Sequence, residues 1–442
     1  MKIQLSDHFT YRKLFSFALP SIIMMVFTSI YGVVDGFFVS NYAGKTAFAA
    51  INFIMPYVMI LASTGFIIGT GGSALIGKTL GEGDKEKANS LFSLLIYISI
   101  LFSIALAFVG VYTTRPVAVL LGADEQMADI ACQYAKVAFV GLPMVTLQYE
   151  FHAFCVVSEK PKLGLFATLA AGFANMILDY LLVGKLNMGV EGAAAATVAS
   201  QCFGGGIPLV YFFSKNSSLL RLGKANIDLK ALWKTLTNGS SEFVSNISMS
   251  VVGMLYNLQL MKYSGENGVA AYGVLMYVNM IFIAIFIGYS IGTAPIISYN
   301  FGAKNKAELK GLFKKSLRII SVFSFLMLIC GEFAAKPLSS IFVGYDEGLM
   351  QLTVNAFRIF SISFLFVSVP IFGSSFFTAL NDGLISAAIS FLRTLVFQIV
   401  AVLVFPIIFG IDGIWYSIIA AEVVAATVTI IFWITKQKKY GY

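Results

Sequence analysis

Long apolar runs alternate with short charged segments along the whole chain. Twelve of these runs are about 20 residues long, the length that an α-helix needs to cross the hydrocarbon core of a bilayer. None shows the alternating apolar and polar positions of a membrane-spanning β-strand. The pattern therefore predicts an all-α membrane protein with twelve transmembrane helices, which begin near Leu14, Phe53, Leu91, Ile130, Leu163, Glu191, Thr237, Val269, Leu317, Leu352, Leu384 and Asp412.

The chain also repeats itself at an offset of about 221 residues. GSALIGKTLG, from Gly72 to Gly81, matches TAPIISYNFG, from Thr293 to Gly302, and GVEG at Gly189 matches GIDG at Gly410. With six helices per half, both halves have the same orientation, so an axis along the membrane normal relates them.

We therefore expect two pseudo-symmetric six-helix bundles. Residues 1–222 form an N-terminal lobe with helices 1–6, and residues 223–442 form a C-terminal lobe with helices 7–12. The polar stretch from Ser214 to Lys234 is the expected linker between them.

Composition agrees with this architecture and indicates its orientation. Hydrophobic residues make up 58% of the chain and charged residues 12%, and the mean hydropathy is +0.84. If the N-terminus is cytoplasmic, 22 Lys and Arg residues fall on the inside and seven on the outside. This excess follows the positive-inside rule, so we expect a multi-pass plasma-membrane protein with both termini in the cytoplasm. The net charge of +8 then needs no nucleic-acid partner.

No motif of a known enzyme stands in the sequence context that it requires. The chain contains no HExxH motif, only two histidines, and four dispersed cysteines without metal-like spacing. The letter patterns GxxxxGK[ST] and GxSxG do occur, at Gly72–Thr79 and Gly288–Gly292, but inside runs predicted to be membrane helices and not at the strand-to-helix turns that these motifs require. We therefore expect no enzyme activity, no cofactor and no structural metal. Uphill transport by such a chain would depend on an ion gradient.

Four polar residues stand out inside the first and fifth spans. Inserting a charge at membrane depth costs about 2.5–3.5 kcal/mol on insertion scales. The presence of Asp35 and Asp179 therefore indicates that each has a structural or functional role. Tyr31 precedes Asp35 by one helical turn, and Asn175 precedes Asp179 in the same way. These oxygens could form a site for Na⁺ or a protonatable pair of carboxyls. The alternative is that each acid caps a loop or bonds to a neighbouring backbone group.

Further candidates lie on other helices. On the sixth helix, Thr197 and Gln201 repeat the four-residue spacing beside small alanines that favour close helix packing. Glu150 and His152, near the end of the fourth helix, are two residues apart and cannot share a helix face, which favours a structural role at the cytoplasmic edge.

The second half offers weaker candidates. Glu242 is expected near the start of the seventh helix, where a carboxylate suits the helix dipole. Arg393 and Glu422 have opposite charges and could form an ion pair or contact substrate. Asn257, on the seventh helix, is a further candidate for the substrate cavity.

These features resemble those of the multidrug and toxic compound extrusion (MATE) family over essentially the whole chain. The resemblance is carried by the segments Ala18 to Ser40, Gly69 to Asn89 and Gly292 to Leu309, together with the two six-helix halves. It implies a V-shaped pair of bundles. It also implies export of cationic or amphiphilic compounds in exchange for Na⁺ or H⁺.

The resemblance further implies a coupling site in the first half. The family's site consists of an Asp of helix 1, an Asn and Asp of helix 5 and a Thr of helix 6, and these positions match Asp35, Asn175, Asp179 and Thr197. Members with a second-half ion site carry acids within helices 7 and 10. Here helix 10 has none from Gln351 to Leu380, so a second-half ion site is not expected.

The sequence thus predicts a secondary active multidrug exporter, working as a monomer among membrane lipids on small, cationic organic substrates by alternating access. A flippase for lipid-linked saccharides would fit the architecture too, but an anionic cargo asks for several cationic cavity residues, and only Arg393 is a candidate. A scaffold or channel would not explain the repeat with its paired acids, and a membrane enzyme would need a catalytic constellation that the chain lacks.

Overall fold

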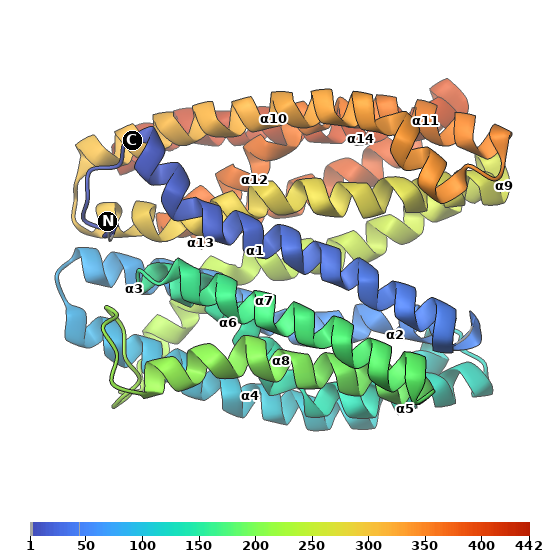
Figure 1. Ribbon diagram of the computed structural model, residues 1–442. Helices are drawn as coiled ribbons and strands as arrows, with labels where there is room; N and C mark the ends of the chain where they lie inside the picture. Colours follow the sequence, from blue (N-terminus) through green and yellow to red (C-terminus); the bar gives the residue numbers. More distant parts are fainter. Residues whose placement is uncertain (1–2, 44) are drawn as a thin grey trace.

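The computed structural model describes residues 3–43 and 45–442, and every regular element in that part of the chain is helical. Figure 1 shows the helices running roughly parallel, with both termini at one end of the molecule, which we call the termini-bearing end. In chain order they are α1 (Tyr11–Phe38), η1 (Val39–Ala43), α2 (Lys45–Ala62), α3 (Thr64–Gly81), α4 (Lys85–Leu120), α5 (Glu125–Val140), α6 (Leu142–Val157), α7 (Pro161–Leu178), η2 (Asp179–Lys185), α8 (Gly189–Phe213), α9 (Leu229–Gly302), α10 (Lys306–Val343), α11 (Glu347–Ser361), α12 (Phe364–Ala379), α13 (Gly383–Phe391), η3 (Leu392–Val396) and α14 (Phe397–Tyr440).

The described residues make twelve spans. Eight helical segments are long and apolar enough to cross a membrane, and two bent pairs, α5 with α6 and α11 with α12, add two more. Two of the eight segments contain two spans each. The 74-residue α9 would be about 110 Å long if straight, far beyond the roughly 30 Å of a bilayer core.

Glycines turn the chain inside these two long segments. Gly265 in α9 has φ 61° and ψ −151°, and Gly410 in α14 has φ 61° and ψ −139°. A side chain is strained in this left-handed region, so glycine suits the reversal between two spans. Gly189, the repeat partner of Gly410 in the sequence, has a positive φ as well, of 59°. At Gly189 and Gly410, the repeat in the sequence therefore corresponds to a repeated backbone conformation at the turn.

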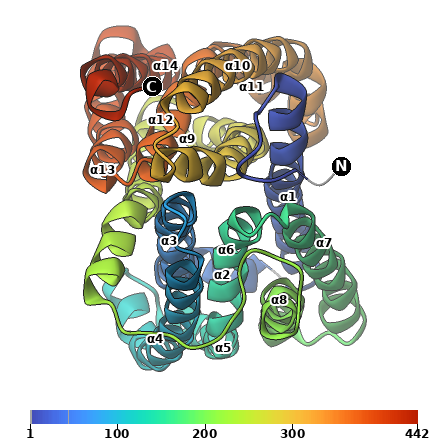
Figure 2. The ribbon, with the colours of Figure 1, turned by 90° about the vertical axis from the view of Figure 1, so that its left-hand side faces the viewer.

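The spans form two bundles. Figure 1 shows α2–α8 in the lower bundle and α9–α14 in the upper one, and Figure 2 shows the same division from the termini-bearing end. Two helices run between them. α1 starts beside the upper bundle and ends in the lower one, while the first part of α9 runs the opposite way. The bundles are thus cross-connected and not simply juxtaposed.

The contact between α3 and α9 displays the twofold relation directly. A Cβ atom added at Gly81 would lie 2.0 Å from the carbonyl oxygen of Tyr299, and one added at Gly302 would lie 2.0 Å from that of Lys78. The repeated segments therefore face each other across the pseudo-symmetry axis, each glycine against the other's backbone. Such close approach requires residues without a side chain.

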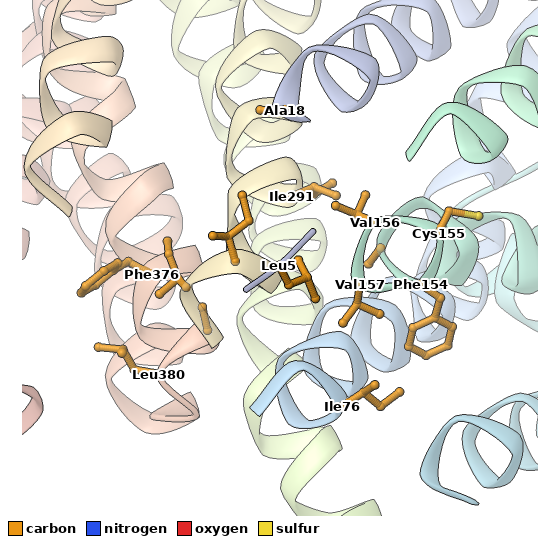
Figure 3. Close-up of a cluster of buried hydrophobic side chains, with 14 of the residues drawn as sticks. Leu5, Ala18, Ile76, Phe154, Cys155, Val156, Val157, Ile291, Phe376 and Leu380 are labelled. Carbon is orange, nitrogen blue, oxygen red and sulfur yellow. The ribbon is translucent and has the colours of Figure 1, made fainter. Parts of the chain in front are cut away.

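Apolar packing joins the bundles at the termini-bearing end. A single cluster of buried side chains there includes Leu5 and Ala18, Ile76 and Phe154 of the lower bundle, and Phe376 of the upper bundle (Figure 3). The other large clusters each belong to one bundle, residues 252–418 or residues 39–194. The described chain is thus tightly joined at one end and divided at the other.

The N-terminal segment reinforces this closed end. The backbone N–H of Leu5 donates to Glu159 Oε1 (2.8 Å) in the lower bundle. His8 Nδ1 lies 2.6 Å from Glu308 Oε2 in the upper bundle, and the N–H of Phe9 donates to the other oxygen of Glu308 (2.9 Å). The segment therefore fastens to both bundles at once.

We expect Gly239→Ala to loosen this end. A Cβ atom at Gly239 would lie 2.0 Å from the carbonyl oxygen of Ile67, so α3 and α9 would have to separate. In a background whose four native cysteines are serine, a cysteine replacing the buried Ser298 should react several-fold faster with a thiol reagent. Gly253→Ala is the control on the same helix, because a Cβ atom there meets nothing within 4 Å. Equal labelling of the two variants would contradict the prediction.

Several helices begin earlier than predicted: α4 begins at Lys85 in place of Leu91, and α10 at Lys306 in place of Leu317. The start of α9 matters most for the candidate residues. α9 begins at Leu229, well before the expected Thr237, because Asp228 caps it by accepting a hydrogen bond from the N–H of Ala231 (3.0 Å). The polar residues that follow continue the helix. Glu242 consequently lies more than three turns inside α9, about 20 Å from its start, and not at the helix end as expected.

Candidate functional site

The structure brings Asp35, Asn175 and Asp179 together. Asp35 lies near the end of α1, and its carboxyl lies against the side chains of Asp179 and Asn175. Asn175 and Asp179 are 2% and 0% exposed, and Asp35 is half-buried. Asp179 is the first residue of the π-helix η2, where the wider turn changes the helical register. Such π-turns often occur at functional sites.

Four oxygens of this acid cluster have no hydrogen-bond donor among the described residues. Asp35 Oδ1, Asn175 Oδ1 and both carboxylate oxygens of Asp179 are buried without a hydrogen-bond partner among the described residues. A buried acceptor without a partner is costly, and two adjacent carboxylates repel each other. The arrangement therefore fits a cation at this point, either a proton or a metal ion with oxygen ligands such as Na⁺. Within the described chain, no group of three His, Cys, Asp or Glu side chains could hold a metal ion.

Aromatic and amide residues surround the acids. The hydroxyl of Tyr31 lies close to the side chains of Asp35 and Gln148. Tyr134, 4% exposed, lies within electrostatic range of both acids. The sequence prediction missed Tyr134 and Gln148. Gln148 could have been found, because an amide inside an apolar span is the same signal that pointed to Glu150, whereas a tyrosine in a span carries little information.

Thr197 and Gln201 lie on α8, which packs against α7 and η2. The hydroxyl of Thr197 donates to the carbonyl of Ala193 (3.0 Å), which leaves its oxygen lone pairs for a further partner. Gln201 Oε1 is buried without a partner in the described residues. These two residues belong to the neighbouring helix, and no hydrogen bond joins them to the acid cluster among the described residues.

Glu150 and His152 lie in the interior of the lower bundle. Glu150 is fully buried, and Ser99 Oγ of α4 donates to its Oε1, which agrees with a structural role. Its burial is explained by Gly69 of α3, where an added Cβ would lie 2.9 Å from the Glu150 Cα, so α3 packs directly against this part of α6. His152, 2% exposed, has its Nε2 3.4 Å from Thr168 Oγ1.

The second-half candidates are not brought into one site. Arg393 Nε lies 3.1 and 3.0 Å from the two carboxylate oxygens of Glu422, and their side chains are 15% and 6% exposed. Of the two interpretations left open, the ion pair is therefore the one observed. Asn257 is exposed, and Glu242 is half-buried on a distant turn of α9.

A pocket opens between the two bundles. Its volume is about 290 Å³, and it lies between α2 and α9. Three methionines contribute to its wall, and their flexible thioether chains adapt to varied ligands. The lining residues are Met55, Pro56, Met59, Ile60, Asn246, Met249 and Ser250.

Fold and site together define a class. Twelve spans in two bundles related by a twofold repeat, with donor-free acids buried in one bundle, are the architecture of a membrane carrier. The chain belongs to the MatE family, that of the multidrug and toxic compound extrusion transporters, which it matches over residues 20–181 and again over residues 243–404. The double match agrees with the repeat found in the sequence.

Relatives cover nearly the whole chain. The multidrug export protein MepA of Staphylococcus haemolyticus (strain JCSC1435) is 26% identical over 94% of this chain and 91% of its own length. MepA of Staphylococcus aureus (strain MRSA252) is 25% identical over 94% and 92%. Among solved structures, a MATE crystal structure in complex with MaL6 has a TM-score of 0.93 at 21% identity, covering 98% of both chains. A MOP superfamily transporter from Pyrococcus furiosus Vc1 (DSM3638) has a TM-score of 0.90 at 20% identity, with the same coverage.

Proposed function

We propose that this protein is a secondary active multidrug exporter that moves cationic or amphiphilic organic compounds out of the cell in exchange for H⁺ or Na⁺. Family membership supports a transporter, and the MepA relatives carry the name of multidrug export proteins. The observation that carries the coupling is the set of buried, donor-free oxygens of Asp35, Asn175 and Asp179. Two buried carboxyls this close are stable only when a cation is bound between them, so the stability of this arrangement depends on the driving ion.

The way the bundles are joined supports alternating access. The bundles share one apolar cluster at one end and have separate clusters at the other. One bundle can therefore rock against the other about the α3–α9 contact. Loading the acid cluster removes the repulsion between Asp35 and Asp179 and favours a different arrangement of α1 and η2. That differential affinity for the two states is what an ion gradient needs to drive substrate release.

The inter-bundle pocket supports a cationic or neutral amphiphilic substrate. Its lining contains three methionines and no Lys or Arg. A flippase for lipid-linked saccharides, the alternative, would bind an anionic pyrophosphate that needs such cations. The one candidate cation of the upper bundle, Arg393, is already paired with Glu422.

We further propose that the termini-bearing end faces the cytoplasm of the cell that carries the protein in its plasma membrane. The positive-inside distribution supports this orientation, and both termini lie at that end. A single cysteine at Gly83 or Lys438 should label only from the cytoplasmic side. Labelling of either from outside would overturn the orientation.

The function is tested by dye efflux from proteoliposomes under an imposed pH gradient or an imposed Na⁺ gradient, one at a time. We expect efflux of a cationic dye with one of the two gradients and none without a gradient. A lipid-scrambling assay in the same vesicles tests the flippase. Scrambling of a lipid-linked saccharide without dye efflux would replace the exporter by the alternative.

A further inference from the structure

A second hollow lies on the outer surface of the upper bundle and shares no lining residue with the inter-bundle pocket. It has a volume of about 290 Å³ and lies between the start of α1 and the first half of α10. Its lining is almost entirely apolar and aromatic, with one cation. The residues are Tyr11, Phe15, Arg318, Ile319, Val322 and Phe323.

Arg318 and Tyr11 are the two polar residues of this groove. In the proposed orientation they lie at the level where the cytoplasmic headgroup region begins. Arg318 is the last of a run of six Lys and Arg residues that starts at Lys304, and an apolar run follows it directly. Tyr11 is the first residue of α1. Arginine and tyrosine at the end of a span are typical of the membrane–water interface.

Arg318 and Tyr11 bond to each other and still have N–H and O–H groups that can donate to a ligand. Arg318 Nη1 donates to Tyr11 Oη (2.6 Å), so the hydroxyl hydrogen of Tyr11 can be given to another acceptor. None of the ion pairs in the described chain includes Arg318, and both residues are exposed. A guanidinium without a carboxylate partner beside a free hydroxyl suits a phosphate group.

The apolar part of the groove continues toward the membrane interior. Phe15 is one turn further along α1, and Val322 and Phe323 are one turn further along α10. The rings of Phe15 and Phe323 are 6.0 Å apart, and the side chains of Phe15 and Val322 are 37% and 59% exposed. A hydrocarbon chain could lie along this surface below the cation.

We propose that this groove binds one anionic phospholipid of the cytoplasmic leaflet. Its phosphate is bound by Arg318 and Tyr11, and one acyl chain lies along Phe15, Val322 and Phe323. The bound lipid bridges α1 and α10, so it stabilises the packing of the start of α1 on the upper bundle. Charge complementarity selects an anionic over a zwitterionic lipid, because the nearby exposed side chains Arg12 and Lys314 add positive charge.

Native mass spectrometry of the purified, detergent-solubilised chain, titrated with phosphatidylglycerol, tests the proposal. We expect one lipid to bind several-fold tighter than the rest. Arg318→Gln should weaken it about fivefold, as expected for one interfacial cation, and Arg318→Lys should weaken it less. Val322→Trp should weaken it by filling the groove. Arg358→Gln, at an exposed arginine in α11, and Val424→Trp, at a similarly exposed valine in α14, are the matched controls and should change nothing.

Three outcomes would overturn the site. Unchanged lipid affinity in both Arg318→Gln and Val322→Trp would show that the lipid binds elsewhere. Equal affinity for phosphatidylcholine would remove the role of charge, and competition by inorganic phosphate at the same concentration as lipid would identify a free-phosphate site. Because Arg318→Lys keeps the charge, it separates loss of binding from loss of folding. The lipid measurement is independent of dye efflux, so it can fail while the proposed export holds.

Discussion

Asp179→Asn is expected to reduce gradient-driven efflux to the level of empty vesicles, and Asp35→Asn should do the same. Each substitution keeps the shape of the side chain but replaces a carboxylate by an amide, so the cluster no longer needs a cation. Without a difference in ion affinity between the two states, the gradient does no work on the substrate. The measurement is the initial rate of dye efflux under the gradient that drives the unmodified protein.

Expression and thermal stability should stay near normal in both variants, because an amide can donate to the carboxylate left beside it. Glu191→Gln is the matched control, since Glu191 is an exposed acid in the first turn of α8 and should keep full efflux. If both cluster variants keep full efflux and full dependence on the gradient, the site is wrong. Glu242 and Glu422 then become the candidates for coupling.

Among the substitutions proposed here, Arg393→Ala is expected to lower the free energy of unfolding the most, by about 3–5 kcal/mol. The substitution leaves Glu422, only 6% exposed, as an unpaired buried charge. Replacing both Arg393 and Glu422 by methionine should recover most of the lost stability, because an apolar pair of similar size leaves no buried charge to neutralise. The measurement is the thermal unfolding midpoint in one detergent.

An exposed pair serves as the control for this prediction. Arg358 Nε lies 4.0 Å from Glu332 Oε2, and these side chains are 57% and 41% exposed. Arg358→Ala should cost no more than about 1 kcal/mol, because water replaces the lost partner. If Arg393→Ala is as mild as Arg358→Ala, burial does not determine the strength of the Arg393–Glu422 pair.

Much of the fold follows from the sequence because membrane helices satisfy their own backbone. Each apolar run of sufficient length must be helical in lipid, whatever it packs against. The number of spans and the repeat were therefore predicted correctly from the pattern of residues along the chain. Glycines of the repeat, such as Gly81 and Gly302, could be recognised as landmarks, although their contact across the axis could not.

The acids of the first half were found for a similar reason. A charge inside an apolar run is costly in any arrangement of the helices, so Asp35 and Asp179 stood out without knowledge of their neighbours. Tyr134 gave no such signal, because tyrosine is tolerated in many surroundings. Its place near both acids depends on how α5 packs against α2, α4 and α8.

Tertiary structure alone decided how deep each polar residue lies. Glu242 was expected at a helix end because polar residues precede it, but the Asp228 cap and helix-permissive residues extend α9 well past it. The full burial of Glu150 depends on Gly69, which lets α3 pack directly against its backbone. The sequence by itself determined which segments are helices and which carry a buried charge, since both follow from local transfer free energies. The meeting of Asp35 with Asp179, and the closing of one end by both bundles, depend on close packing between distant segments, which only the folded chain provides.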